Sequence, residues 1–417
     1  MGMTIAEKIL ARASGRKTVA AGDLVTVRVD TAVLFDNNFM PNNWPDVRRI
    51  DHPERVVVIL DHRVPAPTIQ AAGAHVTARK FVQQFGIARF HDVGQHQGIC
   101  HQVVADEAYA LPGTVLVCSD SHTCSAGALN CVARGVGGPD VFFAACKGET
   151  WFRVGETIRY QLEGSLNPGV TGKDVFLHIA GIYGAHATQN IEFGGPALAK
   201  LSISARKTLA TMGAELSCEF ATFECDEVLL EYLRSRTSAA FQPEHSDPDA
   251  RYADVRVVDL GKLEPLVALP DSVVNNSRSA GDVAGTSIDQ AFIGSCANGT
   301  LEDLRLAAAV LQGRQVSSKV RLIVTPGSQR VYLDAARDGT LARLVEAGAL
   351  ITSPTCGACG GGHMGVLGPE ETCITASTRN FKGRMGDPSS RVYMGSPATV
   401  AASALTGVIT DPRPYLA

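Results

Sequence analysis

A short apolar run, TVLVC at residues 114–118, passes directly into the polar stretch SDSHT at residues 119–123. Four further apolar runs end just as abruptly in polar or small residues: VVVIL at 56–60, AFIG at 291–294, VRLIVT at 320–325 and ALIT at 349–352. Helical patterns separate these runs, and this alternation is typical of α/β proteins. Ligands of open α/β sheets bind beyond the carboxyl ends of the strands, so the polar residues after each run are candidate site residues.

The length of the chain indicates several domains, because 417 residues are too many for one hydrophobic core. Residues 237–253 are rich in Pro and Asp, and residues 270–287 are rich in Ser, Asn, Gly and Asp, so both segments are expected to be loops or linkers. From these breaks we expect three domains, at residues 1–155, 156–278 and 279–417.

Charge and hydropathy exclude several classes of partner. The net charge of −4 predicts neither a nucleic-acid-binding nor a membrane-binding surface. Every apolar run is shorter than the roughly 18 residues that a membrane span needs. At the N-terminus, Thr4 and Glu7 form a capping-box pattern, which predicts a helix in place of a signal peptide. We therefore expect a cytoplasmic protein.

Three of the 11 cysteines stand out by their context. Cys296 lies in GSCANG, and Cys356 and Cys359 form a Cys-x-x-Cys motif in PTCGACGGGH. Glycines on both sides let the backbone approach a bulky ligand and offer N–H groups to it. An odd number of cysteines in a chain with no export signal argues against disulfides, and the other eight are expected to be small buried residues.

The cysteine pattern alone leaves several kinds of site open. The Cys-x-x-Cys motif is compatible with a redox pair, or with a zinc site to which His363 supplies another ligand. The third possibility is a [4Fe–4S] cluster held by the three thiolates. One iron would then have no protein ligand and could act on a substrate as a Lewis acid.

Acidic residues accompany histidines at two of the strand ends. Asp61 directly precedes His62, and Asp120 is separated from His122 by one residue. A carboxylate beside an imidazole fixes its tautomer and raises its pKa, as acid–base catalysis requires. Near the C-terminus, Arg379 and a second arginine five residues later match the bidentate recognition of a dianionic acid.

Together these motifs resemble the aconitase superfamily, in particular the large subunits of 3-isopropylmalate dehydratases of the short, archaeal-type class. The resemblance extends almost from end to end through DH at 61–62, GICHQ at 98–102, SDSHT at 119–123, EF at 192–193, IGSC at 293–296, the Cys356–Leu367 segment and RNFKGR at 379–384. It implies three α/β/α domains with mainly parallel sheets around a central [4Fe–4S] cluster. The implied activity is that of a hydro-lyase for a small 2-hydroxy di- or tricarboxylic acid.

The resemblance also assigns roles to individual residues. The cluster ligands would be Cys296, Cys356 and Cys359. The catalytic groups would be Asp61, His62, His101, Asp120, His122 and Glu192, with His62 and Asp61 protonating the leaving group and His101 paired with Glu192. The substrate would be bound by Ser121, Arg379, Arg384 and Phe35. The family's swivelling domain, which supplies a catalytic serine, is absent before the chain stops at Ala417, so we expect a separate small subunit.

Three features depart from the family pattern. Phe35 stands where these dehydratases usually carry His, Thr378 stands where they carry Asn, and the segment DNNFMPNNW at 36–44 replaces a short turn. These positions would face the substrate or the cluster. We therefore expect a substrate other than isopropylmalate, such as a methylated malate, maleate or citraconate, or homoaconitate.

Three other functions compete with this hypothesis. A zinc-dependent lyase would use the same cysteines. A sensor that binds RNA after losing its cluster would need a basic patch with interleaved aromatic residues, which the sequence lacks. A degenerate subunit would explain Phe35 and Thr378, but the cysteines, histidines, aspartates and arginines named above are all present.

Overall fold

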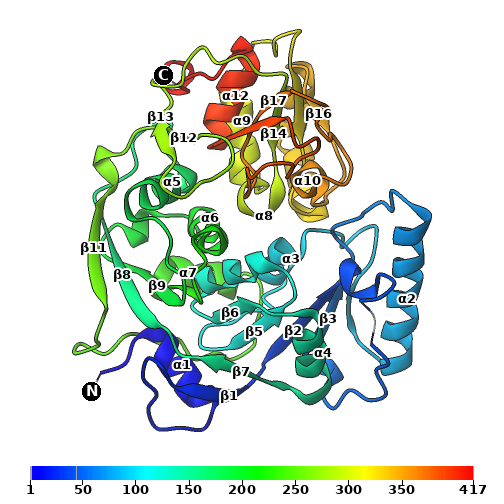
Figure 1. The fold of residues 1–417 in the computed structure, drawn as a ribbon, viewed down its shortest axis with the longest axis vertical. Coiled ribbons are helices and arrows are strands. Elements are labelled where there is room, and N and C mark those ends of the chain that lie inside the picture. Colours follow the sequence, from blue (N-terminus) through cyan, green and yellow to red (C-terminus); the bar gives the residue numbers. More distant parts are fainter. Residues whose placement is uncertain (1, 44, 417) are drawn as a thin grey trace.

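The computed structural model describes residues 2–43 and 45–416 as three α/β domains arranged around a common centre (Figure 1). Three mainly parallel sheets form their cores, and a two-stranded antiparallel sheet, β1 (Leu24–Arg28) with β7 (Glu149–Arg153), joins distant parts of the first domain. The expectation of a mainly parallel α/β fold is confirmed. None of the helices in the described residues is long and apolar enough to cross a membrane.

The first domain contains a five-stranded parallel sheet whose central strands are buried throughout. Continuous apolar strands of this kind need helices on both faces of the sheet. The strands, in sheet order, are β4 (Arg89–His91), β3 (Val56–Ile59), β2 (Thr31–Phe35), β5 (Val115–Cys118) and β6 (Val132–Gly135). The helices are α1 (Ile5–Ala13), α2 (Ile69–Phe85), α3 (Cys100–Asp106) and α4 (Gly138–Lys147), and the 3-10 segment η3 (Ser121–Leu129) follows β5. The predicted capping box of Thr4 and Glu7 opens α1.

The second domain contains a four-stranded parallel sheet. Its strands, in sheet order, are β10 (Ala221–Phe223), β9 (Gln189–Gly194), β8 (Glu156–Glu163) and β11 (Asp254–Asp259). Its helices are α5 (Gly172–Tyr183), α6 (Ile203–Met212) and α7 (Glu227–Arg234), and the short segment η5 (Gly213–Leu216) follows α6. Residues 237–249, in the predicted loop, form no helix or strand and pass beside the N-terminal segment, where Asp247 accepts a hydrogen bond from the backbone of Met3.

The third domain contains a seven-stranded mixed sheet. Its strands, in sheet order, are β13 (Ser277–Ser279), β12 (Leu266–Ala268), β18 (Arg391–Gly395), β17 (Thr372–Thr375), β14 (Gln290–Ile293), β15 (Arg321–Val324) and β16 (Leu350–Ile351). Its helices are α8 (Ser295–Asn298), α9 (Leu301–Leu311), α10 (Gln329–Arg337), α11 (Thr340–Glu346) and α12 (Pro397–Thr406). Because β12 already pairs with β18, the chain enters this sheet before the boundary expected at residue 278. The short strand β13 likewise lies within the predicted loop 270–287.

Candidate active site

The site begins at the carboxyl end of β3, where Asp61 is completely buried. One Asp61 carboxylate oxygen lies 2.7 Å from Nδ1 of His62, and the other accepts a hydrogen bond of 2.8 Å from the backbone N–H of Cys100 at the start of α3. This carboxylate therefore orients the His62 ring and joins the β3 loop to the helix that carries His101. Burial opposes a charge on His62, but the Asp61 carboxylate prevails and raises the His62 pKa well above its usual range.

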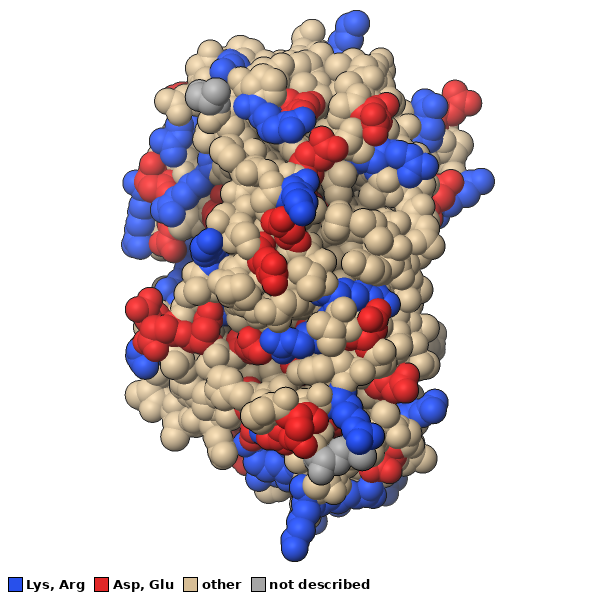
Figure 2. Space-filling model, turned by 90° about the vertical axis from the view of Figure 1, so that its left-hand side faces the viewer, with Lys and Arg blue, Asp and Glu red and all other residues tan. Residues whose placement is uncertain are grey.

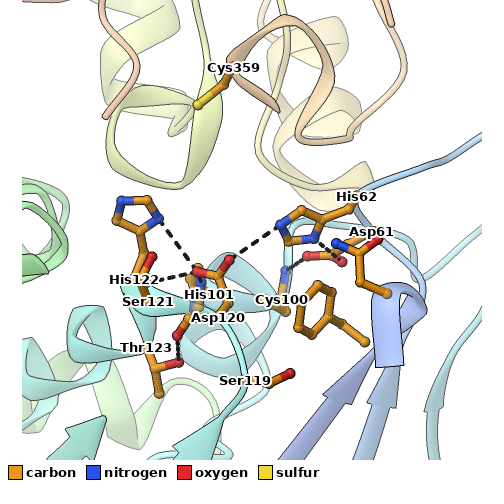
Figure 3. Close-up of polar contacts among 12 residues, drawn as sticks. Asp61, His62, Cys100, His101, Ser119, Asp120, Ser121, His122, Thr123 and Cys359 are labelled. Carbon is orange, nitrogen blue, oxygen red and sulfur yellow. Dashed lines mark hydrogen bonds and ion pairs between the residues drawn. The ribbon is translucent and has the colours of Figure 1, made fainter. Parts of the chain in front are cut away.

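Asp120, at the carboxyl end of β5, contacts all three predicted catalytic histidines. Its carboxylate lies 2.7 Å from Nε2 of His101 and 3.4 Å from Nε2 of His62, and it accepts a hydrogen bond of 2.8 Å from the backbone N–H of His122. Figure 3 shows these side chains converging on Asp120 below Cys359. Burial raises the pKa of Asp120, but the neighbouring imidazoles, His101 foremost, lower it to well below the usual range. Asp120 is therefore a fixed negative charge among groups that can carry protons.

A second carboxylate, Glu215 in η5, faces this cluster from the second domain. Its Oε1 lies 2.9 Å from Nε2 of His122 and accepts a hydrogen bond of 2.8 Å from Nε of Arg379. Burial lowers the pKa of His122, but Asp120 and Glu215 outweigh it and raise that pKa to about 9. Arg379 also donates a hydrogen bond of 2.7 Å to the Ser121 hydroxyl. Glu215 and Arg379 thus connect residues from all three domains.

A cavity of about 210 Å³, here called the central cavity, separates these groups from the cysteine loop. It brings together acid–base residues, three arginines and the glycine-rich segment. It is lined by Asn37, His62, Arg63, Pro67, Asp120, Cys356, Gly357, Gly360, Gly362, His363, Arg379 and Arg384. Such a cavity has room and positive charge for a small di- or tricarboxylic acid beside a proton donor.

The three predicted cluster cysteines are buried thiols on two loops of the third domain. Cys296 belongs to α8, directly after β14, and Cys356 and Cys359 flank the start of the 3-10 segment η7 (Gly357–Gly360). Hydrogen bonding from Cys356 lowers the Cys359 pKa well below its usual range despite burial, and the charge of Arg384 acts in the same direction. The thiolate, the form that binds metals, is therefore favoured at Cys359. Burial raises the pKa of the free Cys296 thiol, and the hydrogen bond with Cys359 raises that of Cys356.

The arrangement of the thiols fits an inorganic cluster better than a single ion. The structure contains two described groups of three ligand atoms all within 4.8 Å of one another, and the three cysteines do not form such a group. His363, which a zinc site would need, places Nε2 3.0 Å from the backbone oxygen of His62. A Cβ at Gly360 would contact the Cys356 sulfur at 3.9 Å, so this glycine keeps one side of that thiol open. Three cysteines beside glycine-rich backbone are the donor set that a [4Fe–4S] cluster uses.

Comparison with known proteins identifies the family. The model of the aconitase family (aconitate hydratase) matches residues 36–279 and 271–407. The 3-isopropylmalate dehydratase large subunit of Mycolicibacterium smegmatis is 54% identical over 100% of this chain and 98% of its own length. The chain belongs to the aconitase family.

Two further relatives of this aconitase-family chain are archaeal. The 3-isopropylmalate dehydratase large subunit 1 of Methanopyrus kandleri is 46% identical over 100% of both chains. The probable methanogen homoaconitase large subunit of Methanothermobacter thermautotrophicus is 41% identical over 99% of this chain and 98% of its own. The solved structure of holo aconitase X from Thermococcus kodakaraensis is 13% identical and covers 85% of this chain and 84% of that one, with a TM-score of 0.49. The predictions of the aconitase family and of a hydro-lyase are confirmed.

The predicted pairing of His101 with Glu192 is wrong. His101 pairs with Asp120, whereas Glu192, on β9, is completely buried among groups of the first and second domains. The Glu192 carboxylate accepts hydrogen bonds from four partners: the backbone N–H of Ile5 (3.0 Å), NH1 of Arg159 (2.8 Å), Oγ of Ser246 (2.8 Å) and the hydroxyl of Tyr252 (2.6 Å). Every lone pair that could act on a substrate is therefore already occupied in a structural contact.

The sequence contains no indication of Glu215, the carboxylate of the second domain that pairs with His122. No motif marks it, because it follows α6 in the unremarkable segment GAEL. Its partners His122 and Arg379 lie 93 and 164 residues away. Only a prediction of how the three domains pack could have found it.

Phe35 lies under the site and does not line the central cavity. Its ring centroid is 4.6 Å from that of His62, and only 5% of the residue is exposed. Phe35 lines a neighbouring cavity of about 690 Å³ together with Ser119, Pro139 and other residues. Of the other predicted departures, Thr378 has its hydroxyl 3.6 Å from the sulfur of Cys359, which places it at the cluster side of the site.

Proposed function

We propose that this chain is the large subunit of a [4Fe–4S]-dependent 3-isopropylmalate dehydratase that acts with a separate small subunit. The observation that carries the proposal is the central cavity, in which His62 and Asp120 face a cysteine loop and three arginines. The family supports an iron–sulfur hydro-lyase, and relatives named 3-isopropylmalate dehydratase that match the full length of this chain support the substrate.

In this proposal Cys296, Cys356 and Cys359 hold the cluster. When bound, the cluster supplies Lewis acidity toward the hydroxyl that leaves the substrate. The protein side chains supply the proton, the orientation of the substrate and the exclusion of water.

The proton for the leaving hydroxyl comes from His62. Its Nδ1 is held by Asp61, and its raised pKa keeps the ring protonated at neutral pH. Nε2 then carries a proton at the wall of the central cavity, 3.4 Å from the Asp120 carboxylate. A positioned acid of this kind contributes about 10²–10⁴-fold to a rate.

The other histidines keep the site electrically and geometrically fixed. Asp120 stays ionised between His101 and His122, because the imidazoles hold its pKa well below the usual range. Glu215 holds the proton of His122 from the opposite side. This chain of charge-assisted hydrogen bonds fixes the direction in which each ring presents its N–H.

The carboxylates of the substrate are bound by arginine. Arg379 and Arg384 line the central cavity, and Ser121 shares a hydrogen bond with Arg379. Nε of Arg384 is buried without a hydrogen-bond partner among the described residues, so a donor is free there for an acidic ligand. Two guanidinium groups match a dianionic acid.

Phe35 suggested a different substrate, and the comparisons favour isopropylmalate instead. The ring faces a separate cavity and packs against His62, so its replacement of histidine adds an apolar surface beside the site. An apolar surface is compatible with an alkyl branch on the acid. The small subunit would bring the catalytic serine that the family resemblance implies, and we expect the assembled enzyme in the cytoplasm.

The decisive experiment is anaerobic co-purification of this chain with its small subunit, followed by iron, sulfide and zinc analysis and a substrate panel. We expect about four irons and four sulfides per large subunit. Turnover of 3-isopropylmalate should exceed that of homoaconitate, citraconate and methylated malates at least tenfold. Stoichiometric zinc without sulfide would show that the cysteines bind zinc and not an iron–sulfur cluster. Faster turnover of another acid would show that 3-isopropylmalate is not the preferred substrate.

A further inference from the structure

Lys173, near the N-terminus of α5, carries a completely buried ammonium group. Its Nζ donates a hydrogen bond of 2.8 Å to the backbone oxygen of Ser377 and contacts the Met212 sulfur at 3.4 Å. Neither partner is charged. Among the described residues no carboxylate lies within 4.0 Å of Nζ, so this cation has no ion pair.

A buried cation in this position is unfavourable by itself. Removing an ammonium from water is strongly opposed unless an anion compensates it, and the N-terminus of a helix repels positive charge. Burial accordingly lowers the pKa of Lys173 to about 8. A side chain kept in such a place needs a negative charge in its surroundings.

The nearby carboxylates are hydrogen-bonded to groups other than Lys173. Glu215 is bound to His122 and Arg379. Asp303, at the start of α9, accepts hydrogen bonds from Thr300 and from the Asn298 amide, and its burial raises its pKa to about 6. Neither carboxylate is positioned as a counter-ion for Lys173.

The remaining groups near Lys173 that would carry negative charge with a cluster bound are the candidate cluster cysteines. Cys296 is the strongest electrostatic partner of Lys173, and Cys359 is another. The backbone contact points the same way, because Ser377 directly precedes Thr378, whose hydroxyl touches the Cys359 sulfur at 3.6 Å. The Lys173 side chain thus extends from the second domain to the Ser377–Thr378 loop of the third domain, which contacts Cys359.

We propose that Lys173 is the buried counter-charge of the iron–sulfur cluster and raises its reduction potential. The inference rests on the proposed cluster. Three thiolates and a [4Fe–4S]²⁺ core together carry a net negative charge, which grows on reduction. A fixed ammonium nearby therefore stabilises the reduced form more than the oxidised form, and it does so strongly in a dry interior.

Lys207 provides a matched control in the same domain. It is also buried, with 3% of the residue exposed, but its Nζ donates to Oε1 of Gln102 at 2.5 Å, and Gln102 in turn is bound to the Asp106 carboxylate. Asp106 is the strongest electrostatic partner of Lys207, ahead of Cys296. Lys207 therefore shares the neighbourhood of Cys296 but has, through Gln102, a carboxylate partner that Lys173 lacks.

The test is a redox titration, followed by electron paramagnetic resonance, of the complete two-subunit enzyme after anaerobic purification. At a fixed potential, Lys173→Met should lower the ratio of reduced to oxidised cluster about tenfold, a shift of about 59 mV for one electron. Lys207→Met should change this ratio less than threefold. Met212→Glu, which places a carboxylate beside the ammonium, should act like Lys173→Met, whereas Met212→Gln should act like the wild type.

The experiment distinguishes the failure of the proposed cluster from the failure of the proposed role of Lys173. A wild-type enzyme without iron and sulfide would overturn the cluster itself. A wild-type cluster whose potential is unchanged in both Lys173→Met and Met212→Glu would overturn the role of Lys173 alone. The Met212 variants keep the test valid if Lys173→Met does not fold, because they retain the lysine.

Discussion

Two buried glutamates of the second domain have opposite surroundings. Glu192 accepts hydrogen bonds from a guanidinium, a backbone N–H of the N-terminal segment and two hydroxyls. None of these donors changes its protonation state near neutral pH. Glu215 binds His122, whose pKa is raised to about 9, and Arg379, which lines the central cavity. Glu192 is therefore structural, whereas Glu215 belongs to the acid–base network, because their hydrogen-bond partners differ.

The largest effect should come from Glu215→Gln. The amide cannot hold the His122 proton by charge and no longer fixes Arg379, so we expect kcat to fall about 10²–10⁴-fold. The measurement is steady-state kinetics of the two-subunit enzyme, with iron content and circular dichroism as controls. A kcat within threefold of the wild type would remove Glu215 from the acid–base network.

Glu192→Gln should instead reduce stability. Loss of one partner of a buried ion pair costs about 3–5 kcal/mol, and the new amide would point N–H groups at donors such as Arg159 and Tyr252. Urea unfolding of the apo-protein measures this change. Molecules that remain folded should keep the wild-type kcat, and a loss of kcat as large as in Glu215→Gln would restore the catalytic role first expected of Glu192.

The pH dependence of stability should separate the two sites further. The folded pKa of His122, about 9, lies above its unfolded value near 6.5, so its stabilisation is complete below pH 6.5 and is lost as the pH rises through 9. The full loss amounts to about 3 kcal/mol. In Glu215→Gln the His122 pKa falls, so the stability advantage of the wild-type apo-protein over this variant should shrink between pH 6.5 and pH 9. For Glu192→Gln the difference should stay constant, and an advantage of the wild type over Glu215→Gln that grows with pH would contradict the assignment.

The smallest effect should come from Ser246→Ala. This hydroxyl donates to Glu192 at 2.8 Å, and its loss leaves the carboxylate three other donors. We expect a decrease of about 1–2 kcal/mol in the free energy of unfolding, with no change in kcat. A denaturation curve and one kinetic assay suffice, and a decrease as large as in Glu192→Gln would mean that Ser246 does more than donate one hydrogen bond.

The sequence predicted those parts of the molecule in which local pattern determines structure. The apolar runs at 56–60, 114–118 and 320–325 form β3, β5 and β15, and polar residues after the first two meet in the histidine–aspartate cluster. These predictions succeeded because buried parallel strands are continuous apolar runs and their carboxyl ends share one edge of a sheet.

Prediction failed where a contact joins distant segments. Glu192 lies within β9 in a motif of the expected kind, yet Ser246 of a distant loop donates a hydrogen bond to it. Glu215 has no local signature, because its meaning depends on how the first and third domains pack against the second. The strands β12 and β13 are three residues long, which is too short for periodicity to distinguish them from a linker.

The cysteine loop rests directly on the loop that presents His62. The Thr355 hydroxyl and the backbone N–H of Cys356 both donate to the backbone oxygen of Asp61, and His363 meets that of His62. Whatever immobilises one loop must also immobilise the other. Binding of the proposed cluster by the cysteine loop should therefore also stabilise the loop that presents His62, because a ligand that binds the folded form of one stabilises both.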